Sequence, residues 1–365
     1  MDNSFIALGL MSGTSLDGID ASIIKSDGEN NLDIIDNKYF NYPEEFRKRL
    51  STFILNVNNK ADIEKNINIY KSLERDLTLY HSRISQRIIN DNNNKIQLVG
   101  LHGQTIIHKP KDGYSVQMGD AKLLSQLLNE KVIYNFRAND IKNNGEGAPL
   151  APIYHKLLIK KLLINDPTLI LNIGGISNYT YCFKDKLMAK DVGPGNVLID
   201  EYLKKTKGIK FDNNGDIASS GNINQDIINQ FYEHEFYNVD EKHSYDRKEF
   251  DINFVKGLEF TDAIATLTYF TALIISNNIK KIFKNKINII LCGGGRKNFT
   301  LVNHLKNLIK YEIKLIDDFN IDGDFIESQA FAYLSIRSYL KKPISYPGTT
   351  NVNIPVTGGE IIINY

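Results

Sequence analysis

The sequence predicts an α/β protein built from two similar halves, on two observations. Strand-like apolar runs alternate with segments of helical periodicity, which is typical of mixed sheets covered by helices. A strand, a glycine-containing turn and a second strand also occur twice, in "SFIALGLMSGTSLDGIDASII" from residue 4 and in "PTLILNIGGISNYTYC" from residue 167. The 365 residues are enough for two domains with one mixed sheet each.

The individual elements follow from the same patterns. In the first half, strands are expected at residues 5–10, 20–28, 32–42, 96–110, 114–119 and 131–140, with helices within 44–90 and at 120–130. In the second half, strands are expected around the turn of 167–182 and at 287–292, with helices at 196–205, after the turn at 293–298, and at 327–342. The last helix is expected to lead the chain back to the first half. The expected domains are therefore residues 1–138 plus 341–365 and residues 139–340.

The charge balance and the cysteine content exclude several classes of protein. Lysine plus arginine number 44 and aspartate plus glutamate 43, so no nucleic-acid partner is indicated. The two cysteines, Cys182 and Cys292, cannot form a disulfide framework and are expected to be buried apolar residues. The opening "MDNSFIALGL" lacks a secretory pattern and no apolar run is long enough for a bilayer, so we expect a cytoplasmic protein without a membrane partner.

The turn between the first two strands carries more hydroxyls and backbone donors than a hairpin needs. Residues 12–15, "SGTS", form a nest of donors that suits a phosphate. Gly13 and Gly18 are expected to supply backbone angles that other residues avoid and to let a ligand approach closely. Asp17 would repel an anion unless a divalent cation or a hydroxyl-bearing substrate lies between them. A decorated hairpin turn, in which Asp17 caps its own backbone, is an equally good interpretation.

Two further glycine turns lie in the second half. Gly174 and Gly175 match the opening turn in position, and two such loops fit a site that holds one polyphosphate from both sides, although a Gly-Gly pair alone is usually only a turn. Gly293, Gly294 and Gly295 separate a strand from a helix and allow a flat ligand close to the backbone. This run matches neither the Walker nor the GxGxxG pattern.

Asp191, in "KDVGPGN", is the candidate catalytic base. The rigid Gly-Pro-Gly that follows fixes the direction of its carboxylate, which a kinase needs for accepting a proton from an attacking oxygen. Capping of the next helix is the commoner use of such an aspartate.

Several polar residues of other segments are weaker candidates. His102 and Gln104 flank a glycine, as polar groups at a sugar site do. Arg137 can pair with Asp140 or with a substrate carboxylate. Glu327 opens the last long helix, where a carboxylate interacts favourably with the helix dipole, and that role is sufficient by itself.

A series of stretches resembles, in order, the anhydro-N-acetylmuramic acid kinase family and covers nearly the whole chain. They are "GLMSGTSLDGID", "HGQTIIHKP", "QMGD", "NFRAND", "GAPLAP", "LNIGGISN", "DVGPGN", "LCGGGRKN" and "ESQAFAYL". No single stretch is specific, but the ordered set is. The family belongs to the sugar kinase, Hsp70 and actin superfamily, so the resemblance implies two ribonuclease-H-like domains of the actin-like ATPase fold facing across a nucleotide cleft.

The resemblance implies a cell-wall recycling enzyme that cleaves the internal bond of 1,6-anhydro-N-acetylmuramic acid with water and phosphorylates O6 with ATP. Its products are N-acetylmuramic acid 6-phosphate and ADP, and Mg²⁺ is bound mainly through the phosphates. Asp191 is the implied base for the water. The implied sugar contacts are Thr105, Arg137 and Glu327, and Gly293 to Gly295 lie along the adenosine. The implied phosphate-binding residues are Ser12, Gly13, Thr14, Ser15, Leu16, Asp17, Gly18 and Ile19.

The chain departs from the family pattern at two places. Val192 follows the motif aspartate where threonine is common, and residues 242–250, "KHSYDRKEF", have Asp246 where glycine is usual. The alternatives are another small-molecule sugar kinase of the superfamily and a nucleotide-binding module without catalysis, against which the intact Asp191 argues. The resemblance allows a homodimer.

Overall fold

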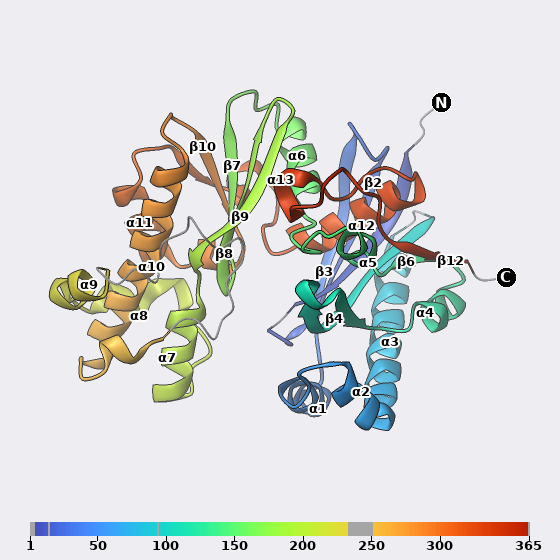
Figure 1. Cartoon of the computed structure of the whole chain (residues 1–365), viewed down its shortest axis with the longest axis horizontal. Helices are drawn as coiled ribbons and strands as arrows, with labels where there is room; N and C mark the ends of the chain where they lie inside the picture. Colours follow the sequence, from blue (N-terminus) through green and yellow to red (C-terminus); the bar gives the residue numbers. More distant parts are fainter. Residues whose placement is uncertain (1–3, 14, 93–94, 233–250, 364–365) are drawn as a thin grey trace. The chain divides into compact units, whose positions relative to one another are not determined.

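The computed structural model describes residues 4–13, 15–92, 95–232 and 251–363, and the chain forms two compact units (Figure 1). Unit 1 consists of Met1–Leu163 with Phe325–Tyr365, and unit 2 of Ile164–Asp324. These boundaries differ from the expected ones at 138/139 and 340/341, because α6 (Pro152–Lys161) and α12 (Ile326–Tyr339) pack on the sheet of unit 1.

Unit 1 contains a 7-stranded mixed sheet with the order β12-β6-β4-β1-β2-β3 and with β5 paired to β4. The strands are β1 (Phe5–Ser12), β2 (Gly18–Ser26), β3 (Leu32–Asn41), β4 (Leu98–Lys109), β5 (Tyr114–Met118), β6 (Lys131–Tyr134) and β12 (Glu360–Ile362). β2 is antiparallel to β1 and β3, whereas β4 is parallel to β1 and β6. The strand expected over 131–140 ends at Tyr134, because Asn135 has a positive φ of 53° and α5 (Ala138–Lys142) follows.

Unit 2 repeats the same strand arrangement in a 5-stranded sheet with the order β11-β10-β7-β8-β9. Its strands are β7 (Thr168–Ile173), β8 (Ile176–Phe183), β9 (Lys186–Pro194), β10 (Asn288–Cys292) and β11 (Ile313–Leu315). β8 is antiparallel to β7 and β9, and β10 is parallel to β7 and β11. Both units therefore have the strand order of the ribonuclease-H-like fold, which confirms the expected fold class.

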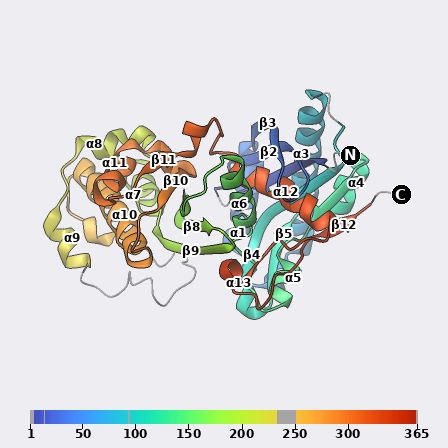
Figure 2. The ribbon, with the colours of Figure 1, turned by 90° about the horizontal axis from the view of Figure 1, so that it is seen from above.

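Two helices cover opposite faces of the sheet in unit 1. Leu8 and Leu10 belong to a buried core that includes Leu73 of α3 (Ile67–Asn90). Gly9 points to the other face, because successive strand residues alternate. A Cβ atom on Gly9 would lie 2.0 Å from the carbonyl oxygen of Ser328 in α12, so the glycine permits the close approach of this helix. Figures 1 and 2 show α12 beside β2.

The other helices complete the two units. Those of unit 1 are α1 (Glu44–Leu55), α2 (Lys60–Lys65), α4 (Ala121–Leu128) and α13 (Pro347–Thr350). Those of unit 2 are α7 (Val197–Lys207), α8 (Asp216–Ser220), α9 (Gln225–Tyr232), α10 (Phe260–Ile282) and α11 (Phe299–Leu308), with the short 3-10 helices η2 (Asn213–Gly215), η5 (Asn253–Val255), η6 (Gly294–Lys297) and η7 (Ile316–Phe319). None of the helices in the described part of the chain combines the length and apolar character that a membrane span requires.

Candidate active site

The opening turn of residues 12–18 joins β1 to β2, and Thr14 within it lies outside the described residues. Among the described residues of the turn, Leu16 is left-handed, with a φ of 57°, whereas neither Gly13 nor Gly18 has a positive φ. The expectation that these two glycines supply unusual backbone angles is therefore wrong. The strained position belongs to a residue that is not glycine, so neighbouring contacts must hold the turn in shape.

The two glycines of the turn differ in their surroundings. A Cβ atom on Gly18 would lie 2.1 Å from the carbonyl oxygen of Phe40 in β3, so only glycine fits there. Among the described residues, a Cβ atom on Gly13 would meet nothing closer than Ser15 Oγ, at 3.7 Å. The backbone at Gly13 is therefore open to a ligand on the side where other residues carry a side chain.

A buried chain of hydrogen bonds begins at the first residue of the turn. Ser12 Oγ lies 2.8 Å from the hydroxyl of Tyr42 and 3.3 Å from Nε2 of His81. Nδ1 of His81 lies 2.9 Å from the Leu77 carbonyl, which only accepts, so Nδ1 carries the proton. Burial lowers the pKa of His81 to about 4, so its Nε2 accepts from Ser12 at neutral pH and Tyr42 donates to Ser12. The hydroxyl of Ser12 therefore donates its hydrogen bond to His81 within the protein.

Asp17 pairs with a cation of the protein. Its Oδ1 lies 2.6 Å from Nη2 of Arg47 in α1, and both side chains are partly exposed. Neither interpretation of Asp17 from the sequence, a bridging cation or capping of its own backbone, included this ion pair. Because the guanidinium offsets the carboxylate charge, Asp17 repels an anion in the turn less than an unpaired carboxylate would.

The residues expected at the sugar, Thr105, Arg137 and Glu327, all belong to unit 1. Arg137 donates to the Gly147 carbonyl at 2.7 Å and to Nε2 of His102 at 2.9 Å, while its buried Nε has no partner among the described residues. Burial lowers the pKa of Arg137 to about 10, so it remains a cation at neutral pH. Glu327 keeps exposed surface, but the protein atoms around its carboxyl raise its pKa, and Arg137 opposes that rise.

Gln104 links the opening turn to the strand that carries Thr105. It is the register partner of Ser12 across β1 and β4, and its Nε2 donates to the Gly13 carbonyl at 3.3 Å. Gln117 Nε2 donates to Thr105 Oγ1 at 3.3 Å from the neighbouring strand β5. The opening turn is therefore held by the residue of β4 that directly precedes Thr105.

Asp140 supports Arg137 indirectly. Its buried carboxylate accepts hydrogen bonds from the Gly147 amide and from Thr350 Oγ1, both at 2.6 Å. The Gly147 carbonyl in turn accepts from Arg137. Of the two partners expected for Arg137, Asp140 therefore acts by shaping the loop around Gly147 and by its charge, without a direct hydrogen bond.

Asp191 lies beside a β-bulge in β9 of unit 2. The register pairs Asp191 with Asn178 and skips Val192, whose side chain is fully buried in the core of the unit. The Val192 carbonyl accepts from Asn278 Nδ2 at 2.8 Å, which fixes the bulge. Bulges redirect neighbouring side chains, so this one helps to set the direction of Asp191. The N-cap of α7 is Asn196, so the interpretation of Asp191 as the cap is wrong.

The second glycine turn is joined to the start of α7 through its carbonyl oxygens. The Gly174 carbonyl accepts from the Asn196 amide at 2.8 Å. The Gly175 carbonyl accepts from the amides of Gly195 and Val197, at 2.9 and 3.1 Å. The turn thereby provides partners for amides that the first turn of a helix leaves unpaired.

The third glycine turn lines a pocket of about 500 Å³ within unit 2. A Cβ atom on Gly293 would lie 2.3 Å from Asn172 Oδ1, and one on Gly295 2.2 Å from Ile173 Cγ2, so both glycines allow packing against β7. A Cβ atom on Gly294 would meet Asn196 Nδ2 at 3.8 Å, which is ordinary contact, and Gly294 is the glycine of the three that lines the pocket. The other lining residues are Asn196, Ile199, Asp200, Phe211, Asp212, Asn213, Asn214, Arg296, Lys297, Asn298, Phe299, Leu315 and Asp317.

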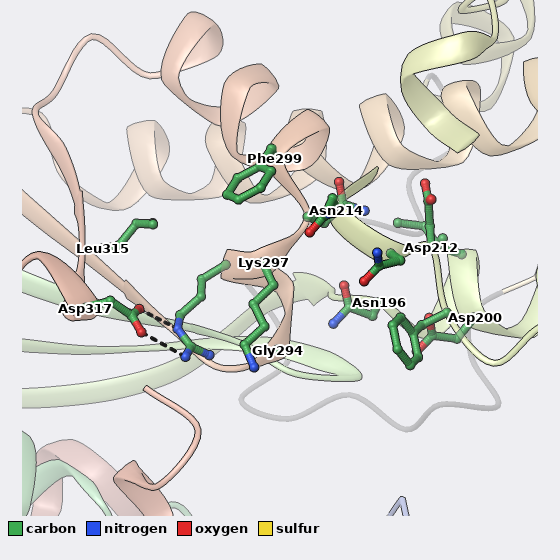
Figure 3. Close-up of a pocket in the computed structure, with 14 residues that line it drawn as sticks. Asn196, Asp200, Asp212, Asn214, Gly294, Lys297, Phe299, Leu315 and Asp317 are labelled. Atoms are coloured by element: carbon green, nitrogen blue, oxygen red, sulfur yellow. Dashed lines mark hydrogen bonds and ion pairs between the residues drawn. The ribbon is translucent and has the colours of Figure 1, made fainter. Parts of the chain in front are cut away.

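The pocket combines aromatic and polar surfaces. Figure 3 shows Leu315 and Asp317 on one side and Asp200 and Asp212 on the other. Phe211 and Phe299 line it as well and are 59% and 54% exposed, which is unusual for phenylalanine. Exposed aromatic groups in a concave site suit a flat ring with polar edges.

Arg296 fixes the wall of this pocket and could not be singled out from the sequence. Its side chain is 3% exposed and binds both oxygens of Asp317, at 2.6 and 3.0 Å (Figure 3). Nη1 also donates to Asp324 at 2.7 Å and to the Gly293 carbonyl at 3.1 Å. One buried cation therefore ties the third glycine turn to the segment after β11.

The sequence comparisons agree with these features. The sequence model of the anhydro-N-acetylmuramic acid kinase family matches residues 5–364. The chain belongs to this family. A relative of that name from Pelagibacter ubique is 47% identical over 376 residues, with 100% of each chain covered. Those from Zymomonas mobilis and Brucella canis are each 36% identical and cover 98% and 97% of this chain and 99% and 97% of their own.

Membership of the anhydro-N-acetylmuramic acid kinase family confirms the resemblance seen in the ordered motifs. Of the two departures from the family pattern, Val192 occupies a fully buried site, where an apolar side chain is well accommodated. The other departure, residues 242–250, lies outside the described residues. Sequence reasoning did not identify Tyr42, His81 or Arg296, because their partners are far away in the chain.

Proposed function

We propose that this chain is an ATP-dependent kinase that opens 1,6-anhydro-N-acetylmuramic acid and phosphorylates its O6. The observation that carries the proposal is the full-length match to the anhydro-N-acetylmuramic acid kinase family. Two ribonuclease-H-like sheets, each with a glycine turn after its first strand, support it.

The opening turn is the proposed site for the phosphates of ATP. The open backbone at Gly13 and the pairing of Asp17 with Arg47 both favour an anion there. Gly174 and Gly175 are proposed to contribute from the second turn. The phosphate-binding set in this proposal is Ser12, Gly13, Thr14, Ser15, Leu16, Asp17, Gly18 and Ile19.

The pocket beside Gly294 is the proposed site for adenosine. Its aromatic surfaces offer stacking for the base, and the asparagines among its lining residues offer donors and acceptors for polar edges. Gly293 and Gly295 take part indirectly, because they let the turn lie against β7.

Asp191 is the proposed general base. A water molecule gives its proton to the Asp191 carboxylate while its oxygen attacks the anomeric carbon and the bond from that carbon to O6 breaks. The electron pair left on O6 attacks the γ-phosphorus of ATP, and ADP leaves. The reaction balances as water, anhydro sugar and ATP giving sugar 6-phosphate, ADP and the proton that Asp191 then releases.

Thr105, Arg137 and Glu327 are the proposed sugar contacts. Arg137 is a cation at neutral pH and suits the carboxylate of the muramic acid lactyl group. Its Nε has no partner among the residues that the structure describes, and this leaves one donor to satisfy, which supports a ligand in this region.

Mg²⁺ enters with ATP in this proposal and is held mainly by phosphate oxygens. The carboxylate of the opening turn, Asp17, is already engaged with Arg47, so it is not freely available as a metal ligand. When bound, Mg²⁺ neutralises phosphate charge during the transfer. We further propose a cytoplasmic enzyme that acts as a homodimer in cell-wall recycling.

Mass spectrometry of the product tests the proposal. The chain is incubated with the anhydro sugar, MgATP and oxygen-18 water. We expect a sugar phosphate that has gained one water, with no label in its phosphoryl group, and ADP in equal amount. A phosphorylated product without the added water would instead indicate another sugar kinase. ATP binding without turnover of any anhydro sugar would favour the noncatalytic module.

A further inference from the structure

Tyr42 contacts both ends of the opening turn. Its hydroxyl lies 2.8 Å from Oγ of Ser12, the first residue of the turn. Its backbone amide donates to the carbonyl of Asp17 at 2.9 Å, at the other end. One residue, located just after β3, therefore bridges the two strands that the turn connects.

The side chain of Tyr42 is itself firmly placed. It is 6% exposed and packs edge-on against Phe46, with ring centroids 5.1 Å apart, and it also contacts Tyr80. The hydrogen-bond chain continues from Ser12 to the buried ring of His81, so the position of the Ser12 hydroxyl is set from two sides. Such a fixed network reduces the number of conformations that the turn can adopt.

We propose that Tyr42 is a positioning residue for ATP, because it holds the opening turn in the shape that receives the phosphates. The inference rests on the proposed function only in taking this turn as the phosphate site. Tyr42 is buried and acts on the turn through its hydrogen bonds to Ser12 and to the Asp17 carbonyl. Since the left-handed Leu16 lies between these contacts, loss of the hydroxyl should let the turn relax away from this conformation.

The test is Tyr42→Phe with Tyr80→Phe as the matched control. Both remove one hydroxyl from the same aromatic cluster, but only the Tyr42 hydroxyl contacts Ser12. We expect Tyr42→Phe to raise the Kd and KM for MgATP about three- to tenfold, the size typical of one hydrogen bond, with kcat and the KM for the sugar nearly unchanged. Tyr80→Phe should leave all four values close to wild type.

Two further variants, Ser12→Ala and the double variant Tyr42→Phe with Ser12→Ala, test whether Tyr42 acts through Ser12. If Tyr42 acts through Ser12, the double variant should bind MgATP about as weakly as the weaker single variant. A Kd for MgATP in Tyr42→Phe equal to that of Tyr80→Phe, or fully additive effects in the double variant, would overturn the proposal.

The affinity measurement separates this inference from the proposed function. A wild-type chain that binds MgATP but turns over no anhydro sugar would refute the proposed reaction and leave the test of Tyr42 intact. A wild-type chain with normal turnover and an unaffected Tyr42→Phe variant would refute the inference alone. A wild-type chain that binds no MgATP would refute both.

Discussion

Replacement of Arg296 by methionine should destabilise unit 2 by about 3 kcal/mol. Methionine keeps most of the length of the side chain but removes the bonds to Asp317, Asp324 and the Gly293 carbonyl. Hydrogen bonds to charged groups contribute about 1.5–3 kcal/mol each. The carboxylates of Asp317 and Asp324 are 44% and 39% exposed, so water would solvate them in the variant and hold the loss below the simple sum of these bonds.

The loss of stability caused by Arg296→Met should become smaller as the pH falls. The hydrogen bonds from Arg296 hold the pKa of Asp317 below 3.8, and at Asp324 burial is outweighed by hydrogen bonds from Lys297 and Arg296, so that pKa is lowered too. A carboxyl with a lowered folded-state pKa stabilises the fold above its unfolded pKa and loses this effect as the pH falls through the folded value. The difference between wild type and variant should therefore be largest near pH 7 and shrink below about pH 4.

Urea unfolding at a series of pH values measures this difference. Lys314→Met, which removes an exposed ion pair with Glu312 in the same unit, should change the unfolding free energy by less than about 1 kcal/mol. A constant gap between Arg296→Met and wild type from pH 7 to pH 3 would refute the electrostatic reasoning. A gap no larger than that of Lys314→Met would refute the structural role of Arg296.

Three further predictions concern activity. Asp191→Asn should lower kcat by about 10²- to 10⁴-fold while ATP still binds, and a near-normal rate would remove Asp191 from the mechanism. Gly13→Val should weaken MgATP binding, measured by calorimetry, far more than it lowers Tm, because a Cβ atom there meets only Ser15 Oγ, at 3.7 Å; the reverse pattern would contradict a phosphate site. Glu327→Gln should raise the KM for the sugar more than that for ATP if it contacts the sugar, whereas equal kinetics with a lower Tm would indicate helix-dipole stabilisation alone.

The fold could be predicted because its signals are local. Two strand–turn–strand patterns mark the same positions in both sheets, at β1–β2 and at β7–β8. The boundaries between the units could not be predicted as well from the sequence, because they depend on which sheet a helix packs against. Gly9 accommodates α12 against β1, and nothing within the helix itself reports that distant contact.

The candidate site was predictable only in part for a similar reason. Motifs identify residues that would meet substrates, such as Asp191, because their chemistry is visible in a short stretch. No local pattern indicates the roles of Tyr42, His81 and Arg296, because the hydrogen-bond partners of these residues lie 30, 69 and 21 positions away in the chain. The sequence also misplaced the strain of the opening turn at its glycines, because tertiary contacts can hold Leu16 in a conformation that its own preference disfavours.

The first two glycine turns share a feature that explains how such different sequences could serve one kind of ligand. A phosphate is repelled by carbonyl oxygens and attracted by amide hydrogens. In the opening turn the Gly13 carbonyl accepts from Gln104 and from the Leu16 amide, and the Asp17 carbonyl accepts from Tyr42.

In the second turn the carbonyls of Gly174 and Gly175 accept from the start of α7. Unit 1 engages its carbonyls largely through partners on neighbouring strands and loops, whereas unit 2 uses helix amides that need acceptors in any case. Engaged carbonyls are held in fixed directions by donors within the same unit, so they are less free to turn toward a bound anion. The glycines allow a ligand or a neighbouring strand to approach the backbone of the turns. The residues that donate to the carbonyls leave the amide hydrogens as the groups available to an anion. A substitution of Gln104 should therefore weaken nucleotide binding, because its side chain donates to the Gly13 carbonyl and holds that carbonyl in place.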